Sequence, residues 1–107
     1  MITRLWSAKA NEPGSRDYLD HFTSHVLPEL RRLAGYAGST VLTRKTEGEI
    51  EIVVATLWDS LQAIQEFAGA DLDEAVVAAE ADAILSGYDR RVRHFDVALI
   101  DTRPHLP

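Results

Sequence analysis

Apolar residues occupy both faces of one predicted strand in the middle of the chain, Ile50 to Trp58. One face carries Ile50, Ile52, Val54, Thr56 and Trp58, and the other carries Val53, Ala55 and Leu57. Successive side chains of a strand point to opposite faces, so water on either side of this strand would meet a row of apolar groups. We therefore expect both faces to be covered in the folded protein.

The same pattern predicts three further strands. They lie at Ile2 to Lys9, Ser39 to Lys45 and Arg91 to Ile100, and the hairpin strand after Thr46-Glu47-Gly48 begins at Glu49. The last strand places Phe95, Val97 and Leu99 on one face and Val92, His94 and Asp96 on the other. A turn is predicted at residues 11–14, where Asn, Glu, Pro and Gly follow one another.

Apolar residues at steps of three and four predict the helices. The first runs from Ser15, its predicted N-cap, to Leu33, and Pro28 is expected to kink it without ending it. The second starts at Asp59 as N-cap and ends at Gly69. A further helical stretch is predicted from Asp71 to Leu85, closed by Gly87.

The order β-α-β-β-α-β predicts an α+β, ferredoxin-like domain over residues 1–101, with a C-terminal arm at 102–107. In this fold both helices lie on one face of a four-stranded antiparallel sheet, and the other face needs cover. The simplest cover is a second copy of the chain, so we predict a homodimer in which Val53, Ala55 and Leu57 meet the partner subunit. Cover by the segment Asp71 to Leu85, or by the arm, is the alternative.

The composition and net charge of the chain limit the classes of partner that it can bind. The 107 residues, 46% hydrophobic and 26% charged, suffice for one domain that folds alone. A net charge of −6 opposes binding to nucleic acid or to an anionic membrane. The chain has no cysteine and no apolar run of signal-peptide or membrane-spanning length. We expect a soluble, cytoplasmic protein without nucleic-acid or membrane partners.

Candidate chemistry rests on aromatic residues and histidines, because the sequence contains no glycine-rich phosphate loop, Cys/His cluster, Gly-x-Ser-x-Gly elbow or His-Glu-x-x-His pair. These candidates are Trp6, Tyr18, His21, His25, Tyr36, Trp58, Tyr88 and His94. His21 and His25 lie four apart on a helix, but no third ligand follows at helical spacing, so no metal site is predicted.

Two of these residues have two interpretations each. Trp58 ends a strand just before a helix, where it either lines a pocket between sheet and helices or fills the core. His94 shares a strand face with Asp96 and either exchanges a proton with a substrate or is a satisfied interface histidine.

Two stretches carry a family resemblance: residues 57–64, LWDSLQAI, with 67–69, FAG, and residues 93–97, RHFDV. They resemble the antibiotic biosynthesis monooxygenase family of dimeric α/β barrels, and the resemblance spans Met1 to Ile100. Oxygenases of this type carry an asparagine four residues before the tryptophan that matches Trp58, and this chain has Val54 there. Haem-degrading members carry a histidine on the following helix, and residues 60–85 contain none, so no haem is expected.

The resemblance implies a cofactor-independent monooxygenase-like protein. It would act on or bind a small apolar, aromatic or polycyclic molecule in a pocket between sheet and helices. His94 or His25 would be the base, and Trp58, Trp6, Tyr18 and Val54 would contact the substrate. A non-catalytic ligand-binding or structural dimer of this fold is the alternative. A proton-transfer enzyme, such as an isomerase or a cyclase, would use the histidines equally well.

Overall fold

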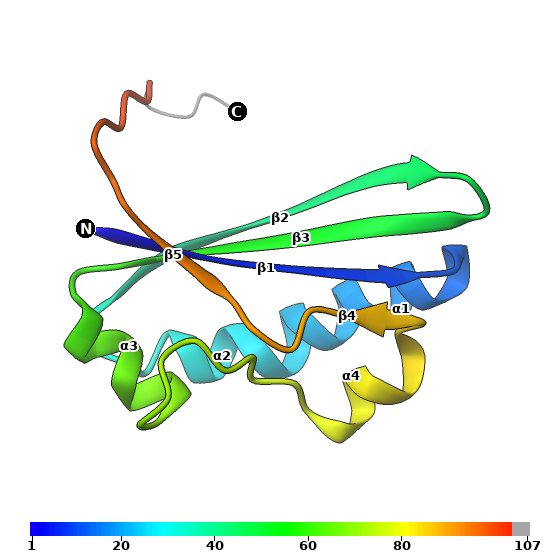
Figure 1. Cartoon of the computed structure of the whole chain (residues 1–107), viewed down its shortest axis with the longest axis horizontal. Helices are drawn as coiled ribbons and strands as arrows, with labels where there is room; N and C mark the ends of the chain where they lie inside the picture. The colour runs from blue at the N-terminus through cyan, green and yellow to red at the C-terminus, as the bar shows by residue number, and fades with distance from the viewer. Residues whose placement is uncertain (104–107) are drawn as a thin grey trace.

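The sheet is antiparallel and all helices lie on one of its faces (Figure 1). The computed structural model describes residues 1–103. Their elements are β1 (Ile2–Ala10), α1 (Glu12–His21), the π-helical turn η1 (Phe22–Val26), α2 (Leu27–Leu30), β2 (Tyr36–Thr46), β3 (Glu49–Trp58), α3 (Leu61–Ala68), α4 (Ala79–Ile84), β4 (Gly87–Tyr88) and β5 (Arg93–Asp96). The α+β prediction is confirmed, but the sheet has five strands instead of four: the predicted last strand, Arg91 to Ile100, forms only over β5, and β4 lies before it and was not predicted.

Strands β1 and β3 form the centre of the sheet. The strand order is β2-β3-β1-β4, and β5 also pairs with β1. The predicted β2-β3 hairpin is confirmed, and its turn holds Gly48 at a φ of +74°. Between β1 and β3, Trp6 lies opposite Val54 and Arg4 lies opposite Thr56. These even-numbered positions face the helices.

The first helix starts earlier than predicted. Its N-cap is Asn11, whose side chain accepts a hydrogen bond from the Gly14 N–H at 2.7 Å, so the prediction of Ser15 as cap is wrong. Pro13 lies in the first turn, where a helix needs no N–H, and residues 12–14 are helical instead of a turn. The helix continues past Pro28 as predicted, and the turn before it is π-helical, with the Leu27 N–H bonded to the Phe22 carbonyl.

The second helical region also differs in detail. Ser60, not the predicted Asp59, caps α3 by accepting from the Ala63 N–H at 3.1 Å. The helix ends at Gly69 as predicted. Of the predicted helix at 71–85 only α4 forms, because backbone groups of residues 71–78 bond to distant partners: the Ala75 N–H reaches the Arg90 carbonyl at 2.9 Å.

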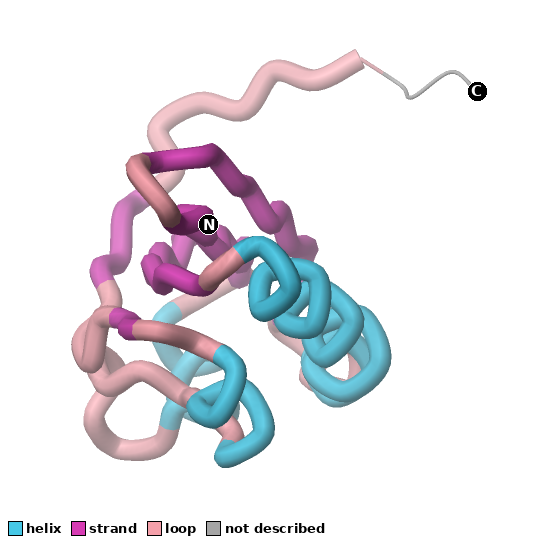
Figure 2. The backbone as a smooth tube through the Cα atoms, turned by 90° about the vertical axis from the view of Figure 1, so that its right-hand side faces the viewer, coloured by secondary structure: helices cyan, strands magenta, loops and turns pink. Residues whose placement is uncertain are grey.

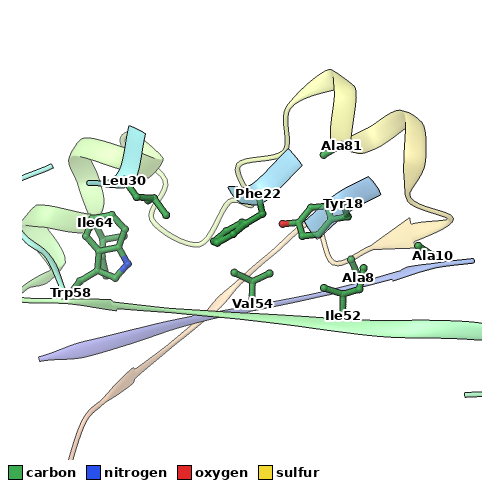
Figure 3. Packing of buried hydrophobic residues seen from close by; sticks show 10 residues of the cluster. All are labelled: Ala8, Ala10, Tyr18, Phe22, Leu30, Ile52, Val54, Trp58, Ile64 and Ala81. Atoms are coloured by element: carbon green, nitrogen blue, oxygen red, sulfur yellow. The ribbon is translucent and has the colours of Figure 1, made fainter. Parts of the chain in front are cut away.

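The core lies between the sheet and the helices (Figure 3). Its largest fully buried side chains are Trp58, Leu30, Ile52 and Ile64. The prediction that the Trp58 face of β3 meets the helices is therefore confirmed. Within residues 1–103, no helix is long and apolar enough to cross a bilayer.

The opposite face of the sheet carries no helix (Figure 2). It bears half-buried Val53 and Leu57 and the exposed side chains of Leu42 and Phe95. The segment 71–85 lies with the helices, so its role as cover for this face is ruled out (Figure 1). After β5 the chain passes to the open side, where Ile100 borders a hollow with Leu57. Of the predicted arm, residues 104–107 lie outside the described part.

Candidate functional site

A cavity of about 340 Å³ lies between the sheet and the helical layer. The sheet contributes Arg4, Trp6, Val54 and Thr56, the first helix contributes Tyr18, His21, Phe22 and His25, and the segment 76–81 closes a further side with Val76, Val77 and Ala81. The lining is mostly aliphatic and aromatic with a few polar groups, which is the usual composition of a small-molecule site.

The floor of the cavity follows from strand pairing. Alternate residues of β1 and β3 share one face, so Trp6 and Val54 lie side by side, and Arg4 and Thr56 form the next row. The Thr56 hydroxyl accepts a hydrogen bond from the Trp58 indole N–H at 2.8 Å. Its own proton has no acceptor among residues 1–103, so the hydroxyl can donate one bond to a ligand.

Tyr18 supplies a second donor. Its ring is buried, with its centroid 5.9 Å from that of Trp6, and its hydroxyl makes no hydrogen bond within the described residues. Figure 3 shows the hydroxyl directed toward Phe22 above Val54. Burial raises the pKa of Tyr18 well above its ordinary value. Tyr18 is therefore a hydrogen-bond donor at neutral pH and does not act as a base.

The raised pKa of Tyr18 predicts a loss of stability in alkali. Above about pH 10 the unfolded chain releases this proton while the folded chain keeps it, so the free energy of unfolding falls as pH rises, by about 1.4 kcal/mol per pH unit for one proton. Urea unfolding measured at several pH values in this range should show that the free energy of unfolding falls less steeply with pH in Tyr18→Phe than in the wild type. A wild-type slope in Tyr18→Phe would contradict the assignment.

Arg4 lies on the cavity floor and bonds to the segment 72–74 beside the cavity. The guanidinium is buried, and it donates to the backbone carbonyls of Leu72 and Glu74, the latter at 2.7 Å. Its Nη1 lies 3.1 Å from His94 Nε2, and His94 Nδ1 lies 3.1 Å from a carboxylate oxygen of Asp73. A guanidinium only donates, so Nε2 accepts and Nδ1 carries the proton toward Asp73. The chain Arg4–His94–Asp73 thus fixes a neutral His94.

His94 is not placed where the sequence predicted a base. It lies behind Arg4, outside the cavity lining, and both ring nitrogens already have partners. The reason is the pairing of β5 with β1, which sets His94 opposite Arg4. In the structure it positions Arg4 and has no nitrogen left for a substrate.

His25 does line the cavity. It sits on the π-helical turn η1 with its side chain exposed at the cavity mouth, and His21 lies beside it with ring centroids 5.4 Å apart. Glu29 and Glu80 also border the cavity and are exposed. Within residues 1–103, no three potential ligand side chains come together as a metal site.

Trp58 belongs to the core and not to the cavity wall. It has no exposed surface, and its ring packs against those of Phe67 and Tyr36 at centroid distances of 5.6 Å each. It reaches the site only through its bond to Thr56. The expected cavity residues Trp6, Tyr18 and Val54 do line the cavity.

Sequence reasoning missed Arg4 and Thr56. A signal for both was available, because each lies two residues from an identified cavity position, Trp6 or Val54, and so shares its strand face. A polar or charged residue at such an inward-facing position is informative, because such residues are seldom buried without a partner.

Comparisons with known proteins bear on the fold. No family model matches the sequence, and no curated protein matches it. Among solved structures, a Bacillus cereus protein assigned as an antibiotic biosynthesis monooxygenase superposes with a TM-score of 0.65 at 19% identity, covering 95% of this chain and 97% of that one. A Deinococcus radiodurans protein with the same assignment gives 0.64 at 15% identity, covering 98% and 100%.

The haem degrader MhuD from Mycobacterium tuberculosis, a structure with two haems in its active site, gives a TM-score of 0.61 at 21% identity and covers 95% of this chain and 100% of its own. The chain shares the fold of these proteins. At these identities the likeness concerns the fold alone, and it confirms the α+β, ferredoxin-like fold of the single chain that the sequence resemblance implied.

Proposed function

We propose that the protein binds a small aromatic molecule in the cavity and oxidises it with molecular oxygen, without a cofactor. The observation that supports this best is the cavity itself. Trp6, Tyr18 and Phe22 offer flat apolar walls, and the hydroxyls of Tyr18 and Thr56 offer donors to an oxygen on the ring. An aromatic molecule with one or more ring oxygens fits this arrangement.

The reaction needs a base and a site sheltered from water. Loss of a proton from an electron-rich phenol gives an anion that can pass an electron to oxygen. In the overall change a ring CH₂ becomes C=O, one atom of O₂ enters the product, and the other leaves as water with the two hydrogens. His25, the imidazole at the mouth, is the proposed base.

Haem is the ligand of one structural neighbour, and this chain does not fit it in the manner of the haem-degrading proteins. Residues 60–85, which include α3 and α4, contain no histidine for an axial bond. The cavity histidines, His21 and His25, come from the first helix instead. We assign no step to haem.

Binding without catalysis is the second candidate. Val54, an aliphatic residue, lines the cavity where the oxygenases of the resembling family carry an amide, and His25 is exposed to water. Both observations favour a carrier or ligand sensor of the same fold. Oxygen consumption separates it from the enzyme.

The binding proposal predicts a measurable loss in Tyr18→Phe. We expect anthrone to bind the wild type in a calorimetric titration, and the variant to bind roughly two- to tenfold more weakly, because one neutral hydrogen bond is lost. Tyr36→Phe, which changes a tyrosine outside the cavity, should bind like the wild type. Wild-type protein that binds neither anthrone nor a tricyclic phenol would contradict the proposal.

The oxygenase proposal predicts consumption of oxygen with anthrone as substrate. His25→Ala should lower this rate by roughly a hundredfold or more, because general-base catalysis contributes at least that much. His21→Ala removes an imidazole from the same mouth and serves as the control. Unchanged turnover in His25→Ala would remove His25 as the base, and binding of anthrone without oxygen uptake would establish the second candidate.

A further inference from the structure

Arg4 is a buried cation that faces the cavity. Only 4% of its surface is exposed, and it lies on β1 between Thr56 of β3 and His94 of β5. Its guanidinium carbon lies 5.7 Å from the ring centroid of Phe67, which also lines the cavity. A charge this deeply buried normally has a direct partner of opposite charge.

The protein partners of Arg4 are uncharged. Three of its five N–H groups bond to the carbonyls of Leu72 and Glu74 and to the neutral His94 ring. No carboxylate lies within ion-pair distance of the guanidinium in residues 1–103. The charge of Asp73 raises the pKa of Arg4, but Asp73 lies beyond ion-pair distance and its side chain is 57% exposed, so water screens its charge.

A purely structural role does not account for this arrangement. Arg4 does hold the carbonyls of residues 72 and 74, next to the cavity wall at 76–78. Bonds to neutral carbonyls compensate little of the free energy lost when a guanidinium leaves water. Burial lowers the pKa of Arg4 by more than the charge of Asp73 raises it, in agreement with incomplete compensation of the guanidinium.

We infer that the cavity takes its ligand as an anion, a phenolate or a carboxylate, that pairs with Arg4 on the cavity floor beside the Thr56 hydroxyl. This inference rests on the proposed function and adds the charge of the ligand to it. An anion there would supply the missing counter-charge and use the remaining N–H groups. The acids Glu29 and Glu80 border the cavity but are exposed, and His21 and His25 lie with them. For a phenol, Arg4 would also favour the anionic form that reacts with oxygen.

Two ligands of the same shape and different charge test the inference on the wild-type protein. We expect 2-naphthoate to bind roughly ten- to a hundredfold more tightly than 2-naphthamide in a calorimetric titration, as for a hydrogen-bonded charge. 2-Naphthol tests the binding of a phenolate. Bound naphthol should ionise at a lower pH than free naphthol, and its absorbance reports the ionisation. If the naphthoate binds more tightly than the naphthamide and the naphthol also ionises at a lower pH, the cavity accepts both carboxylates and phenolates. If only one of these results is found, the cavity accepts that anion alone.

Equal affinities for the two naphthalene ligands, with no shift in naphthol ionisation, would overturn the inference and leave aromatic binding in place. Binding of none of the three would overturn it together with the proposed function.

Variants of Arg4 provide the second measurement. In Arg4→Gln the affinities for 2-naphthoate and 2-naphthamide should come within about twofold of each other, whereas Arg4→Lys should keep part of the preference. Because Arg4 also holds residues 72 and 74, circular dichroism must first show that each variant is folded. A folded Arg4→Gln protein with the full wild-type preference would overturn the role of Arg4. The wild-type comparison decides the question if neither variant folds.

Discussion

Replacing Trp58 with alanine should lower the free energy of unfolding by about 3–5 kcal/mol. Trp58 has no exposed surface, packs between Tyr36 and Phe67, and donates its indole N–H to Thr56 at 2.8 Å. Its removal leaves a large cavity and an unpaired hydroxyl. A loss of this size is a third or more of the stability of many domains, about 5–15 kcal/mol. Urea unfolding followed by circular dichroism measures it.

Trp6→Ala is the matched control. Trp6 is half-buried, faces the cavity, and donates its N–H to the Asp89 carbonyl at 2.7 Å. Its loss should destabilise the protein less, by about 1–2 kcal/mol, and should weaken the binding of an aromatic ligand. An equal loss of stability in both variants would contradict the assignment of one tryptophan to the core and the other to the cavity.

The two faces of β3 show what could be predicted from the sequence. Period-two alternation identifies which residues share a face, so the separation of Val54 and Trp58 from Val53 and Leu57 followed directly. The helix caps were harder because cap chemistry is local and ambiguous. Asn11 and Ser15 are both good caps four residues apart, and Pro13 decided between them.

Residues 71–78 show why local propensity failed elsewhere. Alanines and acids at helical spacing favour a helix, but the carbonyls of Leu72 and Glu74 accept hydrogen bonds from Arg4 instead. The Asp73 carbonyl accepts one from the Val92 N–H at 2.7 Å. These partners lie far away in the sequence. The periodicity of one segment therefore gives no information about these hydrogen-bond partners.

The candidate site was predictable only where it followed periodicity. Trp6, Tyr18 and Val54 lie on faces that the sequence pattern assigns to the interior, and all three line the cavity. His94 was misplaced because its neighbours depend on which strand β5 joins, and pairing with β1 set it against Arg4. Trp58 was ambiguous because core and cavity residues share one face of the same strand.

Replacing Leu57 with aspartate should separate the homodimer that we predict from the open sheet face. Leu57 and Phe95 flank Thr3 across the central strand, and Leu42 lies opposite Val53, so an apolar surface runs over the side that carries no helix. An unpaired charge buried between two such faces costs about 3–5 kcal/mol, which weakens association roughly a hundred- to several thousandfold.

Light scattering at micromolar concentration should therefore show a dimer for the wild type and a single chain for Leu57→Asp. Leu61→Asp is the control, since Leu61 is an exposed leucine that begins α3 on the helical side, where an acid suits the helix N-terminus. That variant should remain a dimer. A wild-type mass of 11.9 kDa, that of one chain, would contradict the homodimer and assign the surface around Leu42 and Phe95 to a different partner.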